Sequence, residues 1–195
     1  MKKSEPTIYG VFIGIDRYAS SAINWLSCAG RDAIALHALF ADNLPGEFTL
    51  LVDKNATRSA IQSEVDELSK CGEDDIVIFA FSGHGSETHE LICYDTDTAD
   101  LGKTAIHLNE LAEWFSKIPA RQLVCILDCC FLGGMGAKAL QVYAKPREVS
   151  SGDKLLQQLS GNGRIILTAS LAVERAWENQ KLGLTRDNQY VMGRI

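Results

Sequence analysis

Hydrophobic residues in this chain gather in short continuous runs, separated by segments with helical spacing. The runs predict buried strands at residues 8–15, 48–52, 76–81, 123–127 and 164–169. Runs without a polar residue at every second position are typical of strands that are covered on both faces. They therefore indicate a parallel sheet in the interior of the protein.

Between the runs, apolar residues recur at helical spacing. This spacing predicts helices at about 31–42, 58–70 and 108–117, and a short one around 155–159. Thr57 is suited to cap the second helix, and a weaker strand is expected at 91–94. Strands that alternate with helices argue for an α/β fold with a mainly parallel central sheet and helices on both faces. We expect one domain over residues 1–195, whose polar end after residue 174 is incomplete or is completed by a partner.

The composition is that of a globular protein. Of 195 residues, 46% are hydrophobic and 23% are charged, and 25 acidic residues against 19 basic ones give a net charge of −6. No basic block offers a footprint for nucleic acid, and no apolar run approaches the ~18 residues of a membrane span. Because the start of the chain is polar and leads directly into a strand, we expect no signal peptide and a cytoplasmic location.

Six cysteines raise the question of disulfides or a metal site. They are Cys28, Cys71, Cys93, Cys125, Cys129 and Cys130. Two lie within apolar runs and two are adjacent in sequence, a poor geometry for a mutual disulfide, so we expect free thiols in a reducing cytoplasm. The chain has no Cys-x-x-Cys pair, and its four histidines lack ligand spacing to the cysteines, so no zinc is expected.

Two of the apolar runs lead into residues with chemical function. His84 follows the run 76–81 by three residues, and Cys130 follows the run 123–127 by three. In an open parallel sheet, reactive groups gather beyond the carboxyl ends of the strands, and the 46 residues between these two (130 − 84) leave room for a crossover helix. An imidazole beside a thiol can take its proton and create a thiolate nucleophile near neutral pH. The sequence therefore predicts a His84–Cys130 catalytic dyad.

Glycines flank the histidine. We expect Gly83 and Gly85 to adopt backbone angles that other residues resist, and to let a substrate carbonyl approach closely. The backbone N–H groups of Gly85 and Cys130 would then stabilise an oxyanion.

Several short segments together resemble a known family. They are Val11–Ile15, Leu26–Ala33, Thr57–Ile61, Phe81–Gly85 and Asp128–Cys130, within a resemblance that runs from about residue 8 to residue 178. Caspases place the histidine roughly 50 residues before the nucleophilic cysteine. The segments look most like those of metacaspases and their prokaryotic relatives, the orthocaspases, which are caspase-like cysteine peptidases of family C14. The resemblance implies the caspase-like three-layer fold and the hydrolysis of peptide bonds.

The resemblance also distinguishes the two adjacent cysteines. The family's Asp-x-Cys pattern makes Cys130 the nucleophile and Cys129 a spacer. Phe131-Leu132-Gly133 stands where the family usually has His-Ser-Gly.

Metacaspases bind the residue before the cut in an acidic pocket, and the matching positions are Asp32, Ser82 and Asp128. Two carboxylates select Arg or Lys in a protein or peptide substrate through charge-assisted hydrogen bonds. Caspases that cut after Asp need an arginine near the position of Leu26, so specificity for Asp is disfavoured. For Asp32 alone, an acid stabilised by a helix N-terminus is an equally good interpretation.

Many metacaspases bind calcium through a long acidic insertion after the histidine. Here the segment Ser86–Glu90 is short, and the acidic loop Asp95–Asp100 is better explained as solvated, so we expect no metal and no cofactor, with calcium activation left open. Related enzymes cut themselves in the segment after the cysteine. Arg147 is the best internal site for such self-cleavage, since Lys145 precedes a proline.

Two other functions compete with the peptidase. One is a catalytically weak caspase-like module that binds a regulatory protein partner, which the Phe131-Leu132 departure favours. The other is a nucleotide-binding protein, prompted by the glycines at 133–136, but Ala137 separates them from Lys138 and breaks the phosphate-loop pattern. Relatives in prokaryotes suggest a role in cell death, stress or defence.

Overall fold

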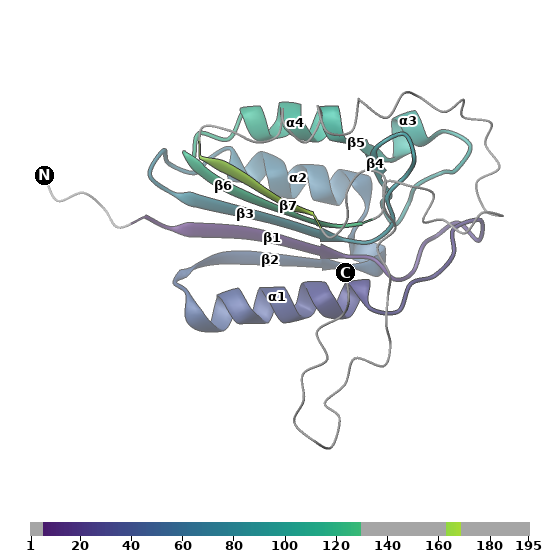
Figure 1. The fold of residues 1–195 in the computed structure, drawn as a ribbon, viewed down its shortest axis with the longest axis horizontal. Coiled ribbons are helices and arrows are strands. Elements are labelled where there is room, and N and C mark those ends of the chain that lie inside the picture. Colours follow the sequence, from purple (N-terminus) through teal and green to yellow (C-terminus); the bar gives the residue numbers. More distant parts are fainter. Residues whose placement is uncertain (1–5, 130–162, 169–195) are drawn as a thin grey trace, which may run out of the picture.

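The computed structural model describes residues 6–129 and 163–168 of the chain. The elements in chain order are β1 (Ile8–Gly14), α1 (Ala29–Asn43), β2 (Gly46–Val52), the 3-10 helix η1 (Asp53–Asn55), α2 (Arg58–Leu68), β3 (Ile76–Ser82), β4 (Glu90–Leu91), α3 (Leu101–Thr104), β5 (Ile106–His107), α4 (Leu108–Ser116), β6 (Gln122–Asp128) and β7 (Arg164–Thr168) (Figure 1). The short helix expected around 155–159 lies outside the described residues.

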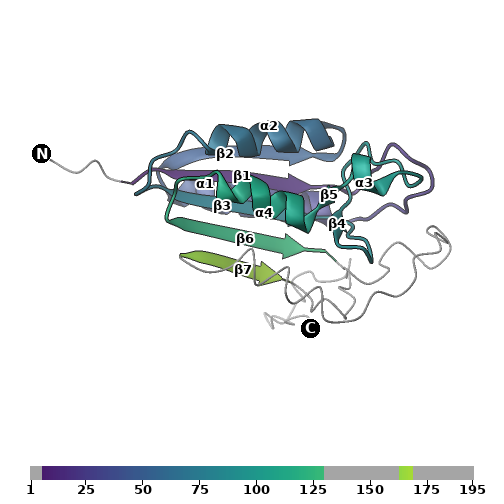
Figure 2. The ribbon, with the colours of Figure 1, turned by 90° about the horizontal axis from the view of Figure 1, so that it is seen from above.

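A parallel sheet forms the centre of the described fold, in the order β2-β1-β3-β6-β7 (Figures 1 and 2). Every neighbouring pair in it is parallel. The five predicted strands are confirmed, because each begins and ends within two residues of its apolar run where the structure describes that end. The mainly parallel sheet expected from the alternation of strands and helices is confirmed as well.

The weak strand expected at 91–94 is wrong in extent. Only Glu90–Leu91 is extended, and it pairs antiparallel with β5 in a separate two-stranded sheet. A turn ends it early, because the Cys93 N–H donates to the Thr96 hydroxyl (2.9 Å) while the Thr96 N–H donates to the Cys93 carbonyl (3.1 Å).

Helices cover both faces of the sheet (Figure 1). On one face α2 and α4 pack over a large apolar cluster, and on the other α1 packs over a smaller one centred on Phe12. Apolar residues at helical spacing in the predicted ranges 58–70 and 108–117 are buried: Ile61, Val65 and Leu68 of α2, and Leu108, Leu111 and Phe115 of α4. Among residues 6–129 and 163–168, no helix is both long and apolar enough to cross a membrane.

The two longer described helices begin by different means. Thr57 caps α2 as predicted, since its side-chain oxygen accepts the Ala60 N–H at 3.2 Å. α1 begins at Ala29, two residues before the predicted start, because a residue distant in sequence caps it. The Asp16 carboxylate accepts the N–H groups of Ala29 (2.9 Å) and Gly30 (3.1 Å).

The start of α1 lies directly against the end of β1. A Cβ at Gly14 would lie 2.4 Å from the Ala29 carbonyl oxygen and 2.7 Å from the Ala33 Cβ, so only glycine fits there. This contact brings the first turn of α1, which contains Asp32, to the carboxyl edge of the sheet.

Candidate active site

Three neighbouring strands end level with one another at the carboxyl edge of the sheet. Gly14 of β1 pairs with Ser82 of β3, and Ser82 pairs with Asp128 of β6. The chain therefore emerges side by side after β3 and after β6, as the predicted dyad requires. The residues that follow these ends, together with the connection from β1 to α1, make up the candidate site.

His84 lies two residues after β3 and is only 5% exposed. Its Nε2 atom is 2.9 Å from the backbone carbonyl oxygen of Asn24. Because a carbonyl oxygen can only accept, Nε2 carries the hydrogen in the neutral ring. Nδ1 then carries the ring's in-plane lone pair, so it is the atom that can take a proton from a nucleophile.

The backbone of His84 is fixed on both sides. Its N–H donates to the Tyr18 hydroxyl at 2.9 Å, and its carbonyl accepts the Ile92 N–H at 3.0 Å. The Tyr18 ring also packs on the imidazole, with ring centroids 5.3 Å apart. Sequence reasoning missed both Tyr18 and Asn24, which lie in a segment with no periodicity, and Asn24 acts through a backbone group that every residue has.

A buried acid closes the turn that follows the histidine. The Ser86 and Thr88 hydroxyls both donate to Glu90 Oε2, the second at 2.6 Å, and the Ser86 N–H donates to the Glu90 carbonyl at 2.9 Å. An antiparallel bridge between Gly85 and Leu91 lies beside this turn. The short segment after the histidine is therefore held rigidly by its own hydroxyl groups.

The structure gives the glycine at residue 83 a role other than the expected one. Its φ does not lie in the left-handed region, so the expectation of an unusual backbone angle is wrong. It leaves space for its neighbours, because a Cβ there would lie 3.1 Å from the Phe81 ring and 3.2 Å from the Tyr18 hydroxyl and would crowd both. The oxyanion role of Gly85 and Cys130 stays a prediction.

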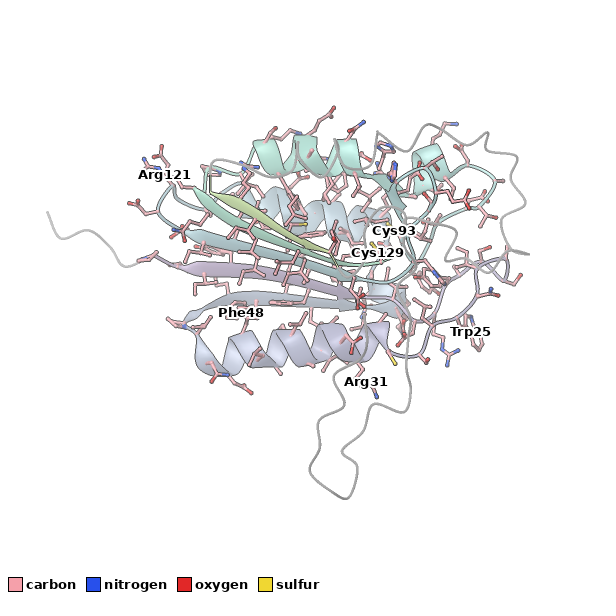
Figure 3. The ribbon with its side chains drawn as sticks, viewed as in Figure 1. Trp25, Arg31, Phe48, Cys93, Arg121 and Cys129 are labelled. Atoms are coloured by element: carbon pink, nitrogen blue, oxygen red, sulfur yellow. The ribbon has the colours of Figure 1, made fainter. Side chains whose placement is uncertain are left out.

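Of the two adjacent cysteines, Cys129 is among the described residues and Cys130 is not. Cys129 follows β6 directly and is 2% exposed, which fits a spacer packed into the core. Figure 3 places it at the carboxyl end of the sheet, opposite the end that carries Arg121. Cys130 and the self-cleavage residue Arg147 lie outside the described residues, so their roles stay predictions.

Two of the three predicted pocket residues are in contact. The Ser82 hydroxyl donates to Asp128 Oδ2 at 3.4 Å, and the Gly83 N–H donates to the Asp128 carbonyl at 3.1 Å. Asp32 is half-buried in the first turn of α1, which packs on the same edge of the sheet. The structure thus brings together Ser82 and Asp128 and places Asp32 at the same edge.

Two further acids at this edge are used by backbone groups. Asp16 caps α1, and Asp53, whose φ is +48°, accepts the N–H groups of Asp16 (2.8 Å) and Arg17 (2.9 Å) through Oδ1. These acids fix the loop and the start of the helix.

In residues 6–129 and 163–168, no three His, Cys, Asp or Glu side chains are grouped as metal ligands. The acids of the 95–100 loop accept hydrogen bonds from other residues of the protein. Asp95 accepts the Arg58 N–H (2.8 Å), Asp97 accepts the Ala99 N–H (2.9 Å), and Asp100 pairs with Lys103 (2.9 Å). That the protein needs no metal stays a prediction.

The structure agrees with the expectation that cysteines in the core are free thiols. Cys71, Cys93 and Cys125 are buried and form no disulfide. Burial raises the pKa of the Cys93 and Cys125 thiols, so both are neutral and unreactive near pH 7.

Comparisons with known proteins bear on both fold and family. The family model of the caspase domain, Peptidase C14, matches residues 9–185. Caspase-1 from Spodoptera frugiperda has a similar fold, with a TM-score of 0.60 and 13% identity over 90% of this chain and 63% of that one. The protein GSU0716 from Geobacter sulfurreducens gives a TM-score of 0.53 and 19% identity, over 64% of this chain and 51% of that one. This chain therefore spans roughly half to two-thirds of their lengths, and no curated protein matches it.

Proposed function

Because this chain belongs to the caspase domain family, we propose that it is a cysteine endopeptidase in which Cys130 is the nucleophile and His84 the general base. One observation carries the proposal. The buried imidazole of His84 donates from Nε2 to the Asn24 carbonyl, so Nδ1 is the ring nitrogen that can act as the base, and β6 ends at the same sheet edge as β3, two residues before Cys130.

In the proposed reaction, His84 Nδ1 takes the thiol proton and the Cys130 sulfur attacks the substrate carbonyl carbon. The carbonyl oxygen becomes an oxyanion, which the N–H groups of Gly85 and Cys130 stabilise. The imidazolium then gives its proton to the leaving amine, and the peptide bond breaks to leave a thioester. Water hydrolyses the thioester with His84 as base, which restores the thiol. The Asn24 carbonyl favours the imidazolium because it accepts the Nε2–H throughout.

We further propose that the enzyme cuts protein or peptide substrates after Arg or Lys. The contact between Ser82 and Asp128 supports this proposal, as does the position of Asp32 at the start of α1. Carboxylates at the base of a pocket bind a guanidinium or ammonium group through charge-assisted hydrogen bonds.

Hydrolysis of a fluorogenic peptide with Arg before the cut tests the function. We expect Cys130→Ala and His84→Ala to reduce turnover by at least ~1,000-fold, because each removes a partner of the nucleophile–base pair. Cys129→Ala is the matched control, and it should retain turnover because that thiol is buried beside the reactive one. Turnover that survives in Cys130→Ala would contradict the proposed nucleophile. An inactive wild type under all activating conditions, calcium included, would favour the alternative of a binding module for a regulatory partner.

A further inference from the structure

We propose that Tyr18 is a positioning residue for the histidine of the proposed dyad, because it fixes the backbone and the ring plane of His84. The inference rests on the proposed His84–Cys130 dyad. It adds to the dyad and the pocket a residue from the connection between β1 and α1.

The Tyr18 hydroxyl makes two hydrogen bonds in the interior. It accepts the backbone N–H of His84 at 2.9 Å and donates to the carbonyl of Ile15 at 3.2 Å. The Ile15 N–H in turn donates to the Ser82 carbonyl at 3.0 Å. The hydroxyl therefore links the end of β1 to the residue that acts as the base. Burial raises the pKa of the Tyr18 hydroxyl, so it stays protonated and keeps the donated bond at working pH.

The Tyr18 ring restricts the imidazole itself. The two ring planes are tilted by 35° at a centroid separation of 5.3 Å, and only 6% of Tyr18 is exposed. Packing on one side of the imidazole and the Nε2 hydrogen bond to Asn24 at its edge together oppose rotation of the ring. A general base must be held close to its productive position, since an error of ~1 Å can cost on the order of 100-fold in rate.

Gly83 provides the space that this arrangement needs. A Cβ at Gly83 would lie 3.2 Å from the Tyr18 hydroxyl and 3.1 Å from the Phe81 ring, distances tighter than nine in ten real Cβ contacts. A side chain at residue 83 would therefore push the hydroxyl away from the His84 N–H. The glycine before the histidine and the tyrosine in a distant loop form one structural unit.

Tyr18 is itself well anchored. The next residue, Ala19, donates its N–H to the Tyr94 carbonyl at 2.9 Å, and Ile23 in the same connection is 2% exposed. Asn24, which binds the Nε2 atom, belongs to this connection too. One loop thus holds both the backbone and the ring of His84.

Substitution of Tyr18 by Phe tests the inference, because it removes the hydroxyl and keeps the ring. With the Arg peptide, we expect Tyr18→Phe to lower kcat by roughly 10- to 100-fold while KM changes by less than about 2-fold. Tyr9→Phe is the matched control, since Tyr9 lies near the opposite end of β1, and it should leave both constants unchanged. Melting curves of the three proteins verify that they are folded.

Gly83→Ala perturbs the same contact from the other side and also serves if Tyr18→Phe does not fold. It should lower kcat in a similar way. In the Tyr18→Phe background its additional effect should be smaller by at least about 3-fold, because the hydroxyl oxygen is gone and only the contact of the new Cβ with the Phe81 ring remains. If the fold-losses in kcat of Tyr18→Phe and Gly83→Ala simply multiply in the double variant, the proposed contact between residue 83 and the Tyr18 hydroxyl is contradicted.

Alkylation of Cys130 separates this inference from the proposed function, because it needs no peptidase activity. The thiolate displaces iodide from iodoacetamide, and peptide mapping by mass spectrometry locates the product. At pH 7, His84→Ala and Tyr18→Phe should both react at least about 5-fold more slowly than wild type, whereas at pH 10 the thiolate forms without a base and the rates should converge.

The outcomes of the alkylation are distinct. If His84→Ala reacts as fast as wild type at pH 7, the dyad fails and the inference fails with it. If His84→Ala is slow while Tyr18→Phe reacts and turns over like wild type, the dyad stands and the role of Tyr18 is overturned. If Tyr18→Phe stays slow at pH 10, it has damaged the site in general, and the positioning role is overturned as well.

Discussion

The imidazole of His84 is held by its surroundings through groups of two kinds. The Asn24 carbonyl accepts from the ring, the Ile92 N–H donates to the His84 backbone carbonyl, and one side chain, Tyr18, contacts both the backbone and the ring of His84. The predicted pocket has a similar mixture, because Asp128 contacts Ser82 through its carboxylate and Gly83 through its carbonyl. At the scale of residues, the candidate site depends on backbone geometry as much as on side-chain identity.

Asp32→Asn tests the predicted pocket. It removes the charge of one carboxylate and keeps its shape, so we expect KM for the Arg peptide to rise by roughly 10-fold, with kcat changed by less than about 3-fold. Asp42→Asn, near the other end of α1, should have no effect on either constant. If Asp32→Asn leaves KM unchanged and costs only about 0.5 kcal/mol of stability, the residue is a helix N-terminal acid stabilised by the dipole.

At the scale of elements, the start of α1 is decided by contacts with distant residues. The Asp16 carboxylate caps the helix, Asp53 holds the backbone of Asp16, and Gly14 lets the helix lie against β1. This chain of contacts fixes the first turn, where Asp32 lies. α2 differs, because its cap is the adjacent residue Thr57.

Asp16→Ala should therefore destabilise the protein by about 1–2 kcal/mol, because it leaves two helix N–H groups without their acceptor. Urea unfolding followed by circular dichroism measures this change as a lower midpoint. Asp66→Ala, an exposed acid on α2, is the control and should change stability by less than about 0.5 kcal/mol. Equal midpoints for the two variants would show that solvent replaces the cap.

At the scale of the molecule, the sheet separates two apolar clusters of unequal size. The larger one joins the sheet to α2 and α4, and contains the edge-to-face pair of Phe79 and Phe115, with centroids 5.3 Å apart. The smaller one joins the sheet to α1 through Phe12, Ile78 and Ala80. The central strand β3 contributes to both clusters and ends in the segment that contains His84, so the stability of the core supports the site.

Phe79→Ala should cost about 3–5 kcal/mol, because Phe79 is fully buried in the larger cluster and its removal leaves a cavity. That loss is a large part of the ~5–15 kcal/mol that stabilises a typical domain. Leu39→Ala is the control, because Leu39 is 58% exposed on α1, and it should change the free energy of unfolding by less than about 0.5 kcal/mol. A similar midpoint for both variants in urea would contradict the proposed core.

The sequence by itself determined the elements and the likeness to a family. Apolar runs such as 76–81 predicted the strands, helical spacing predicted the buried faces of α2 and α4, and the polar residues after the runs predicted which strand ends carry the chemistry. These features were predictable because each depends on residues close in the chain, whose periodicity and caps are visible in one segment. The match of the caspase domain to residues 9–185 confirms the family.

Only the tertiary structure decided how the histidine is held. Asn24 binds Nε2 through its backbone carbonyl, a group that every residue has, so the residue type does not predict the contact. Tyr18 lies 66 residues from His84, in a segment without periodicity. The same reason explains the error at Gly83: a small residue was expected to serve an unusual backbone angle, whereas it leaves room for the Tyr18 hydroxyl. Contacts between distant segments depend on the register Gly14–Ser82–Asp128 and on the packing of loops over that edge, and both exist only after the chain has folded.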